Sequence, residues 1–314
     1  MKRNVVGLGL VALFALGLSC ELPEEGGGGG IGVSNFSRGF VFIRSDDRNV
    51  YASDQSTGYT DVGRLTSNGE NKHPALSPNG QQVVFVHQAG GTSELLVVPM
   101  SGGEPRVLLA QDSTTGRFAN PVFSPDGDQV AFTYERSGGS VLAVINADGS
   151  GFQELSTGAF SYASPSWYPD GQSVLVAAGS LGSGYSQLER VNVTTGQATN
   201  LLNGLGNEAI RIRNRVVLSK DGSRAAFDAD VSSGATRIFV VDLSSSARTV
   251  TQVTDHPADP NANDSFPSWT SSSELAFSSD TGGNDQVYTV SASAQKQGGT
   301  LKLPSAVEPW FGPN

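Results

Sequence analysis

Short hydrophobic runs of strand length recur from residue 37 to the end of the chain, and Gly, Pro, Asn and Asp residues separate them. Within one stretch the runs lie at about 73–77, 81–87, 94–99 and 105–109. The first separator, Pro78-Asn79-Gly80, has turn chemistry, since Pro presets φ, Asn bonds back to the backbone and Gly accepts the positive φ of a hairpin. The pattern therefore predicts a unit of four short strands.

This unit occurs six times. The position that opens its first strand is Pro74, Pro121, Pro165, Val216, Pro267 and Pro309 in the six copies. The sixth copy ends at its own turn, and its missing second strand, Gly39-Phe40-Val41-Phe42, stands at the other end of the chain. A repeat of this length favours a propeller or solenoid, and a repeat split between the termini favours a closed ring. We expect an all-β fold, a six-bladed propeller of four-stranded blades, closed where the C-terminal strand pairs with the N-terminal strands.

The composition agrees with this fold and narrows the function. With 39 Gly, 15 Pro and 16% charged residues, the chain suits many strands and tight turns rather than long amphipathic helices. The formal charge of −10, the pI near 4.7 and the lack of a Lys/Arg cluster argue against binding of nucleic acid. The repeat fills nearly everything after residue 37, so we expect one domain at 37–314 and a monomeric propeller.

Two sets of residues recur with the unit and are interpreted as architecture. The acids of the Pro-Asp-Gly turns bond to their own backbone in such turns, so we expect structural roles for Asp126, Asp170 and Asp221. An aromatic stripe recurs two residues after the proline position, at Phe123, Trp167, Trp269 and Phe311. We expect these rings to form core between blades rather than a ligand cage.

The N-terminal residues precede the repeat and have the composition of a signal for export. Lys2 and Arg3 are followed by the apolar run Val5 to Leu18, which is too short and too rich in glycine for a membrane span and is typical of a signal peptide. Cys20, the single cysteine, follows directly and resembles the lipobox cysteine of bacterial lipoproteins, although Gly17 stands where leucine is usual. The resemblance implies a signal peptide at 1–19 and lipidation of Cys20.

The segment 20–36, which includes Gly26 to Gly30, is predicted to be a tether that holds the domain near a membrane. Glu21 is not the aspartate associated with inner-membrane retention, so the resemblance favours the outer membrane of a bacterial cell envelope.

The units share a longer pattern, as in Pro165-Ser166-Trp167-Tyr168-Pro169-Asp170-Gly171, Asn146-Ala147-Asp148-Gly149 and Arg64-Leu65-Thr66. They resemble the TolB-type propeller repeat, which runs Pro-x-Trp-Ser-Pro-Asp-Gly, a strand ending in Phe, and later Asp-Gly-Gly and Leu-Thr. The resemblance covers residues 37 to 314 and implies the propeller fold. TolB itself carries an α/β domain ahead of its propeller, whereas this chain has only a tether there, so the resemblance does not settle function.

A binding site is predicted where the copies differ. The first strand of each blade lines the central channel, so the residues just before the proline position are expected to ring one mouth: His73, Asn120, Ser164, Arg215, Phe266 and Glu308. Two residues earlier stand Phe118, Tyr162 and Arg213. These positions form either a solvated loop or a mouth for a protein or peptide partner, with Phe118, Tyr162 and Phe266 as anchors and Arg213, Arg215 and Glu308 as orienting charges.

We find no catalytic residues in the sequence. There is no Gly-x-Ser-x-Gly motif, and His73, His87 and His256 do not form a metal triad. The loop with Asp259, Asn261 and Asn263 places oxygens at alternate positions, as a calcium loop does, but glycine and glutamate are missing from their expected places. Calcium is therefore the one cofactor considered, against an ordinary inter-blade loop.

The sequence thus leads to two functional hypotheses. The first is a non-enzymatic, membrane-anchored module of the envelope that binds a protein or peptide at one propeller face. The second is a metal-assisted glycan-acting enzyme, because some TolB-like propellers resemble pectin-fragment lyases that use the same channel. The few histidines favour the first hypothesis.

Overall fold

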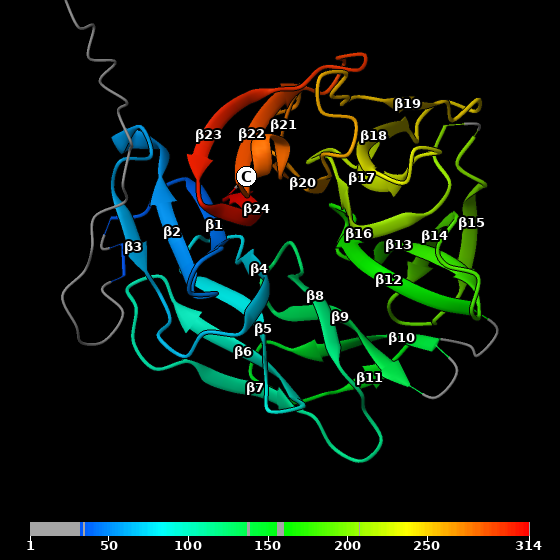
Figure 1. The fold of residues 1–314 in the computed structure, drawn as a ribbon. Helices are drawn as coiled ribbons and strands as arrows, with labels where there is room; N and C mark the ends of the chain where they lie inside the picture. Colours follow the sequence, from blue (N-terminus) through cyan, green and yellow to red (C-terminus); the bar gives the residue numbers. More distant parts are fainter. Residues whose placement is uncertain (1–31, 34, 137–138, 156–159, 207, 314) are drawn as a thin grey trace, which may run out of the picture.

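Six four-stranded antiparallel sheets surround a central channel in the computed structural model (Figure 1). The structure describes residues 32–33, 35–136, 139–155, 160–206 and 208–313. The predicted signal peptide, Cys20 and most of the predicted tether lie outside these residues. In the part of the chain that is described, no helix has the length and apolar character needed to cross a membrane.

Five blades follow one another along the chain, each with its first strand innermost. Blade 1 consists of β4 (Asn71–Leu76), β5 (Gln82–Ala89), β6 (Thr92–Pro99) and β7 (Arg106–Ala110). Blade 2 consists of β8 (Phe118–Phe123), β9 (Gln129–Arg136), β10 (Gly139–Asn146) and β11 (Gln153–Glu154). Blade 3 consists of β12 (Phe160–Trp167), β13 (Ser173–Ser180), β14 (Gln187–Asn192) and β15 (Ala198–Asn203).

Blade 4 consists of β16 (Ile212–Leu218), β17 (Arg224–Asp230), β18 (Thr236–Asp242) and β19 (Val250–Gln252). Blade 5 consists of β20 (Asp264–Trp269), β21 (Glu274–Ser279), β22 (Gln286–Ser291) and β23 (Thr300–Pro304). The closing blade consists of β24 (Ala306–Gly312), β1 (Gly39–Arg44), β2 (Val50–Asp54) and β3 (Val62–Arg64). Two 3₁₀ turns, η1 (Gln55–Thr57) and η2 (Thr281–Gly283), complete the described elements.

The closing blade joins the two ends of the chain as the split repeat predicts. β24 pairs with β1 in an antiparallel register that sets Phe311 opposite Phe40 and Trp310 opposite Val41. Because this pairing supplies the innermost strand of the blade, the prediction of a six-bladed ring closed by the C-terminal strand is confirmed.

The hydrophobic core lies mainly between blades, and polar side chains bond across the same seams. The Oγ of Ser166 in β12 accepts a hydrogen bond from the Leu218 N–H in β16 at 3.0 Å, and the Oγ of Ser268 accepts one from the Phe311 N–H at 2.9 Å. The Trp167 indole likewise donates to the Val122 carbonyl of blade 2 at 3.1 Å. These bonds satisfy backbone groups that would otherwise be buried without partners.

The predicted structural roles of the recurring residues are confirmed. Phe123, Trp167, Trp269 and Phe311 are all at most 7% exposed. In the turns, the carboxylates accept nearby N–H groups, as Asp126 does from the Asp128 N–H at 3.1 Å. Bonds from Ser219 and Ser223 lower the pKa of Asp221 to about 2.

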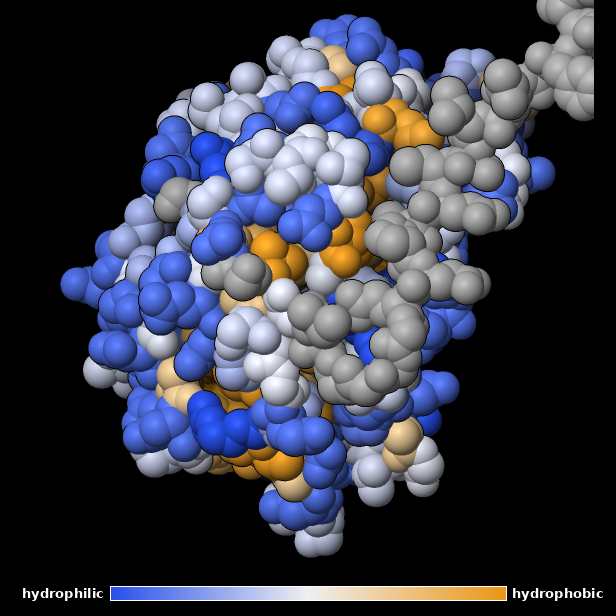
Figure 2. Space-filling view, turned by 90° about the vertical axis from the view of Figure 1, so that its left-hand side faces the viewer, coloured by the Kyte–Doolittle hydropathy of each residue, from blue (hydrophilic) through white to orange (hydrophobic). Residues whose placement is uncertain are grey.

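A strap at the N-terminal end of the described chain ties the closing blade to blade 1. The Val33 N–H donates to the Met100 carbonyl at 3.0 Å, and the Val33 side chain is buried in the core between these blades. The N–H groups of Ser37 and Arg38 donate to Asp54, at 2.6 and 3.2 Å. Figure 2, seen from the side of the closing blade, shows a largely hydrophilic surface on which hydrophobic residues appear in small groups.

Candidate functional site

Five of the six residues predicted to ring the channel mouth lie in a bulge of the innermost strand. His73, Asn120, Ser164, Phe266 and Glu308 all have positive φ, between 49° and 55°. In β4, for example, His73 and Pro74 together stand opposite the single residue Phe85 of β5. Positive φ is uncommon for residues other than glycine. Its recurrence in five blades indicates that the repeat fixes the backbone conformation at this position, whereas the side chain differs from blade to blade.

The ring residues meet one another and close the channel at this level. The His73 N–H donates to Glu308 from across the closing seam, and Arg48 forms an ion pair with the same carboxylate at 3.3 Å. The His73 Nδ1 accepts a hydrogen bond from the Asn120 N–H at 3.2 Å, so this nitrogen carries no proton. Burial lowers the pKa of the His73 imidazole.

Arg215 occupies the sixth position of the ring and lies almost fully buried inside it. Its guanidinium donates to the Pro309 carbonyl and lies 5.2 Å from the Phe266 ring centre and 5.3 Å from that of Trp310. Burial lowers its pKa to about 10, against the opposing effect of the Glu308 and Asp228 carboxylates. Arg215 is thus held as a buried cation by two aromatic faces and a carbonyl.

Blade 4 builds its bulge differently because Val216 replaces the proline of the other copies. The N–H groups of Asn214 and Arg215 donate to the buried Asp228 carboxylate of β17, at 3.3 and 2.7 Å. Burial raises the pKa of Asp228 to about 6, against these hydrogen bonds. Asp228 therefore positions the strand that carries Arg215.

Trp310 separates this layer from the other half of the channel. Its side chain, from β24, packs against the cores that blades 1, 2 and 3 share with their neighbours. On the ring side it borders a cavity of about 10 Å³ together with His73, Asn120, Ser164 and Arg215. That volume suits at most one water molecule, so the channel is plugged here.

The other predicted partner-binding residues are not brought to one place. Phe118 is buried in blade 2 in a T-shaped contact with Phe132, and the buried Tyr162 donates its hydroxyl to Glu189 at 3.2 Å. Only Arg213 is well exposed, with its Nε 3.3 Å from Asp230. The bulge explains this arrangement, because an extra residue breaks the alternation that would put every second side chain on one side.

An open funnel lies on the opposite side of Trp310, where the innermost strands end in their turns. It is a cavity of about 290 Å³, and its walls include Leu76, Phe123, Trp167, Leu218 and Trp269. The turn residues Pro78, Pro125, Pro169, Lys220 and Pro313 form its rim. The recurring turn proline is the signal that could have located this funnel in the sequence.

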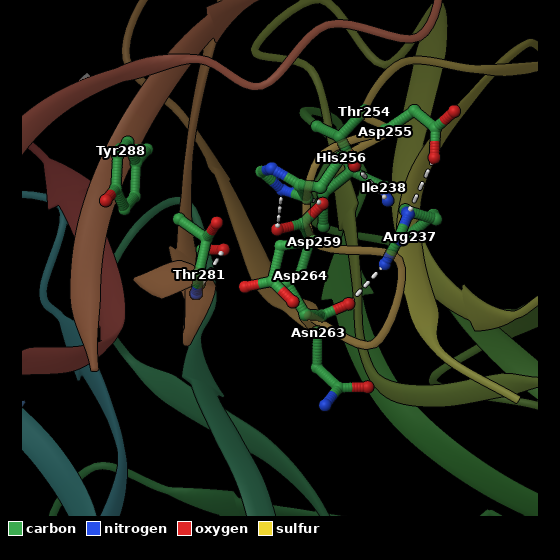
Figure 3. A network of polar contacts seen from close by, with 12 residues as sticks. Arg237, Ile238, Thr254, Asp255, His256, Asp259, Asn263, Asp264, Thr281 and Tyr288 are labelled. Carbon is green, nitrogen blue, oxygen red and sulfur yellow. Dashed lines mark hydrogen bonds and ion pairs between the residues drawn. The ribbon is translucent and has the colours of Figure 1, made fainter. Parts of the chain in front are cut away.

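The loop considered for calcium surrounds an arginine (Figure 3). Arg237 is 2% exposed and donates to the carbonyls of Pro260, at 3.1 Å, and Ala262. Asp259 accepts from the Gly282 N–H at 3.1 Å, and the Asn263 Oδ1 accepts from the Thr236 N–H at 3.1 Å.

The third candidate ligand, Asn261, contributes its backbone carbonyl to Asn263 at 3.3 Å. The described ranges hold no group of three or more His, Cys, Asp or Glu residues placed to bind a metal ion. A calcium site at Asp259, Asn261 and Asn263 stays a prediction, which calorimetry with calcium before and after Asp259→Ala tests; absence of heat removes it.

The fold and this channel define a six-bladed propeller with one plugged mouth and one open apolar funnel. A family model described as TolB beta propeller domain matches residues 34–218, more than half of the chain, and the chain belongs to this family. A search of curated proteins finds no match.

Solved structures show the same fold at low sequence identity. TolB from Acinetobacter baumannii has a TM-score of 0.64 and 16% identity, over 87% of this chain and 66% of that protein, slightly under two thirds of its length. A protein described as TolB from Agrobacterium tumefaciens has a TM-score of 0.63 and 18% identity, over 85% and 88%. An oligogalacturonate lyase in complex with manganese has a TM-score of 0.56 and 17% identity, over 85% and 78%.

Proposed function

We propose that this chain is a membrane-anchored, non-enzymatic module of the bacterial envelope that binds a protein or peptide partner through the open funnel. The TolB-type propeller fold supports a protein-interaction module. The funnel is the observation that carries the proposal, because the residues expected to bind a partner at the other mouth are buried, paired or distant from one another.

The size and lining of the funnel suit a short segment of a partner. Its volume of about 290 Å³ is close to the lower end of the range of about 300–1,000 Å³ for small-ligand pockets. A folded domain cannot enter such a space, whereas one or two side chains of an extended peptide fit it. Phe123, Trp167 and Trp269 belong to the core between blades, and the small part of each ring that borders the funnel offers apolar contact to such a side chain.

The tether leaves the propeller on the funnel side. A side-chain carbon placed on Gly80 in the β4–β5 turn would lie 3.2 Å from Pro313 of the rim and 3.8 Å from Phe36 of the strap. Cys20 lies only twelve residues before Gly32 in the sequence. With Cys20 lipidated, the connection to the membrane would start from the funnel side of the propeller.

The experiment compares the two faces by crosslinking and pull-down from intact envelopes. The variant Pro125→Trp, Pro169→Trp fills the funnel mouth at two exposed turn positions where most residues are tolerated. The matched variant Arg213→Glu alters the opposite face. Loss of the captured partner with the first variant alone supports the proposal; loss with Arg213→Glu alone assigns the partner to the other mouth, and capture unaffected by both refutes the proposal.

The enzyme hypothesis is kept because the manganese-bound oligogalacturonate lyase shares the fold. It is tested with acidic oligosaccharide and Mn²⁺, comparing wild type with His73→Ala. Turnover that depends on His73 would establish this second function.

A further inference from the structure

The rim of the funnel contains one position at which the repeat changes chemistry. The turn residue after the end of the first strand is proline in four copies, Pro78, Pro125, Pro169 and Pro313. The same position is Ser271 in blade 5 and Lys220 in blade 4. Of these two residues, Lys220 borders the funnel and Ser271 does not. Lys220 is also the one charged residue that borders the funnel among the described residues.

The rest of the funnel wall offers few free polar groups. Ser77 and Ser219 each accept a backbone N–H and donate to the acceptor of their own turn, Asn79 and Asp221. The Ser166 and Ser268 hydroxyls accept the backbone N–H groups of the next blade. An apolar group suits most of the funnel wall, because a polar group placed against it would lose its water without gaining a partner.

Lys220 is exposed, and its ammonium makes no ion pair or hydrogen bond within the described chain. The carboxylates of its own turn and of the corresponding turn in blade 3 are already engaged. Asp221 accepts from Ser219, at 2.6 Å, and from the Ser223 N–H, at 3.1 Å. Asp170 pairs with Arg190 at 2.6 Å. An anionic group on a ligand in the funnel would meet an unpaired cation, although the chain as a whole carries a formal charge of −10.

We propose that the funnel binds an extended peptide in which an apolar side chain rests on Trp310 and a neighbouring carboxylate pairs with the Lys220 ammonium. This inference rests on the proposed function and names the class of partner segment. The four prolines and the aromatic walls hold the apolar side chain, and Lys220 fixes the position and direction of the peptide. Lys220 is thus a specificity-determining residue, since a charge at the rim selects among partners that share an apolar side chain.

The test measures the affinity of two peptides for two forms of the protein, as in a double-mutant cycle. Binding is followed by fluorescence polarisation with the full-length chain in detergent. The peptides are fluorescein-labelled Gly-Ser-Phe-Glu-Gly-Ser and its Phe-Gln counterpart, and the proteins are wild type and Lys220→Met. We expect wild type to bind the Phe-Glu peptide roughly 1.5- to fivefold more tightly than the Phe-Gln peptide. Lys220→Met should bind both peptides equally, and the wild-type preference should fade with added salt.

Controls separate the site from general charge effects. Lys302→Met removes another exposed lysine, on the outer strand β23, and should keep the wild-type preference. Equal binding of both peptides by wild type, or a preference that survives in Lys220→Met, overturns the inference, and so does failure of both peptides to bind at millimolar concentration. Displacement of the Phe-Glu peptide by decanoate but not by unlabelled peptide assigns the funnel to lipid anions and also overturns it.

The outcome is distinguishable from failure of the proposed function. If envelope capture depends on the funnel while the peptides show no Lys220-dependent preference, the funnel binds the partner by another chemistry. If capture does not respond to Pro125→Trp, Pro169→Trp, the proposed function itself fails.

Discussion

The replacement of Asp228 by asparagine should change how the stability of this protein depends on pH. Asp228 is fully buried on β17 and accepts hydrogen bonds from the N–H groups of Asn214 and Arg215. Burial outweighs these bonds and raises its pKa from 3.8 to about 6. The charged groups around Asp228 are linked through Arg215. The Asp228 and Glu308 carboxylates both favour the charged form of the Arg215 guanidinium.

The sign follows from the proton balance. Between about pH 4 and 6 the folded protein holds a proton on Asp228 that the unfolded chain has lost, so the free energy of unfolding falls as pH rises through this window. At 1.36 kcal/mol per pKa unit, a rise from 3.8 to about 6 corresponds to about 3 kcal/mol. Wild type should therefore lose on the order of 3 kcal/mol relative to Asp228→Asn between pH 4 and pH 7.

Urea unfolding followed by tryptophan fluorescence, at intervals of half a pH unit, measures this difference. Any constant effect of the substitution on the β16 bulge cancels, because only the change of the difference with pH is compared. A difference that stays flat from pH 4 to pH 7, or that grows in favour of wild type as pH rises, would refute the account of Asp228 as a buried carboxyl with a raised pKa.

Three other predictions concern ring closure, the core between blades and the anchor. Deleting residues 307–314 removes most of β24, so the closing blade loses its innermost strand; we expect loss of the cooperative urea transition, and a retained transition would contradict ring closure. Phe311→Ala should lower the free energy of unfolding by about 3–5 kcal/mol, because the ring is 2% exposed and packs on Phe40; a loss under 1 kcal/mol would contradict its place in the core. Cys20→Ala should move the protein from the membrane fraction to the soluble fraction of cells, and unchanged membrane association would refute lipid anchoring.

The blades could be predicted from the sequence because each strand and turn is specified by residues that are close together in the chain. The turn at Pro125-Asp126-Gly127, the strand that follows it and the aromatic Phe123 are all encoded within a few residues and then repeated. The split sixth copy also predicts the pairing of β24 with β1. The C-terminal part of this copy lacks its second strand, and the N-terminal part supplies one, so the two parts complete one blade.

The candidate site could be predicted only in part. Sequence spacing correctly places His73, Arg215 and Glu308 on the innermost strands around the channel. It does not reveal the positive φ at His73 and Glu308, which makes a bulge and breaks the regular alternation of side chains. For this reason the expectation that Phe118 and Tyr162 face a mouth together with the ring is not met by their buried positions.

The repeat in the sequence was sufficient to establish the class of fold, the number of blades and the way the ring closes, because each of these depends on short-range patterns that recur. Which end of the channel is open depended on contacts between residues far apart in the chain. Trp310 from the last strand reaches the cores of blades formed more than 100 residues earlier, and Arg215 completes the plug from blade 4. Only the folded ring brings these side chains together, and only there does Lys220 become the one charge, among the residues that the structure describes, on the wall of the funnel.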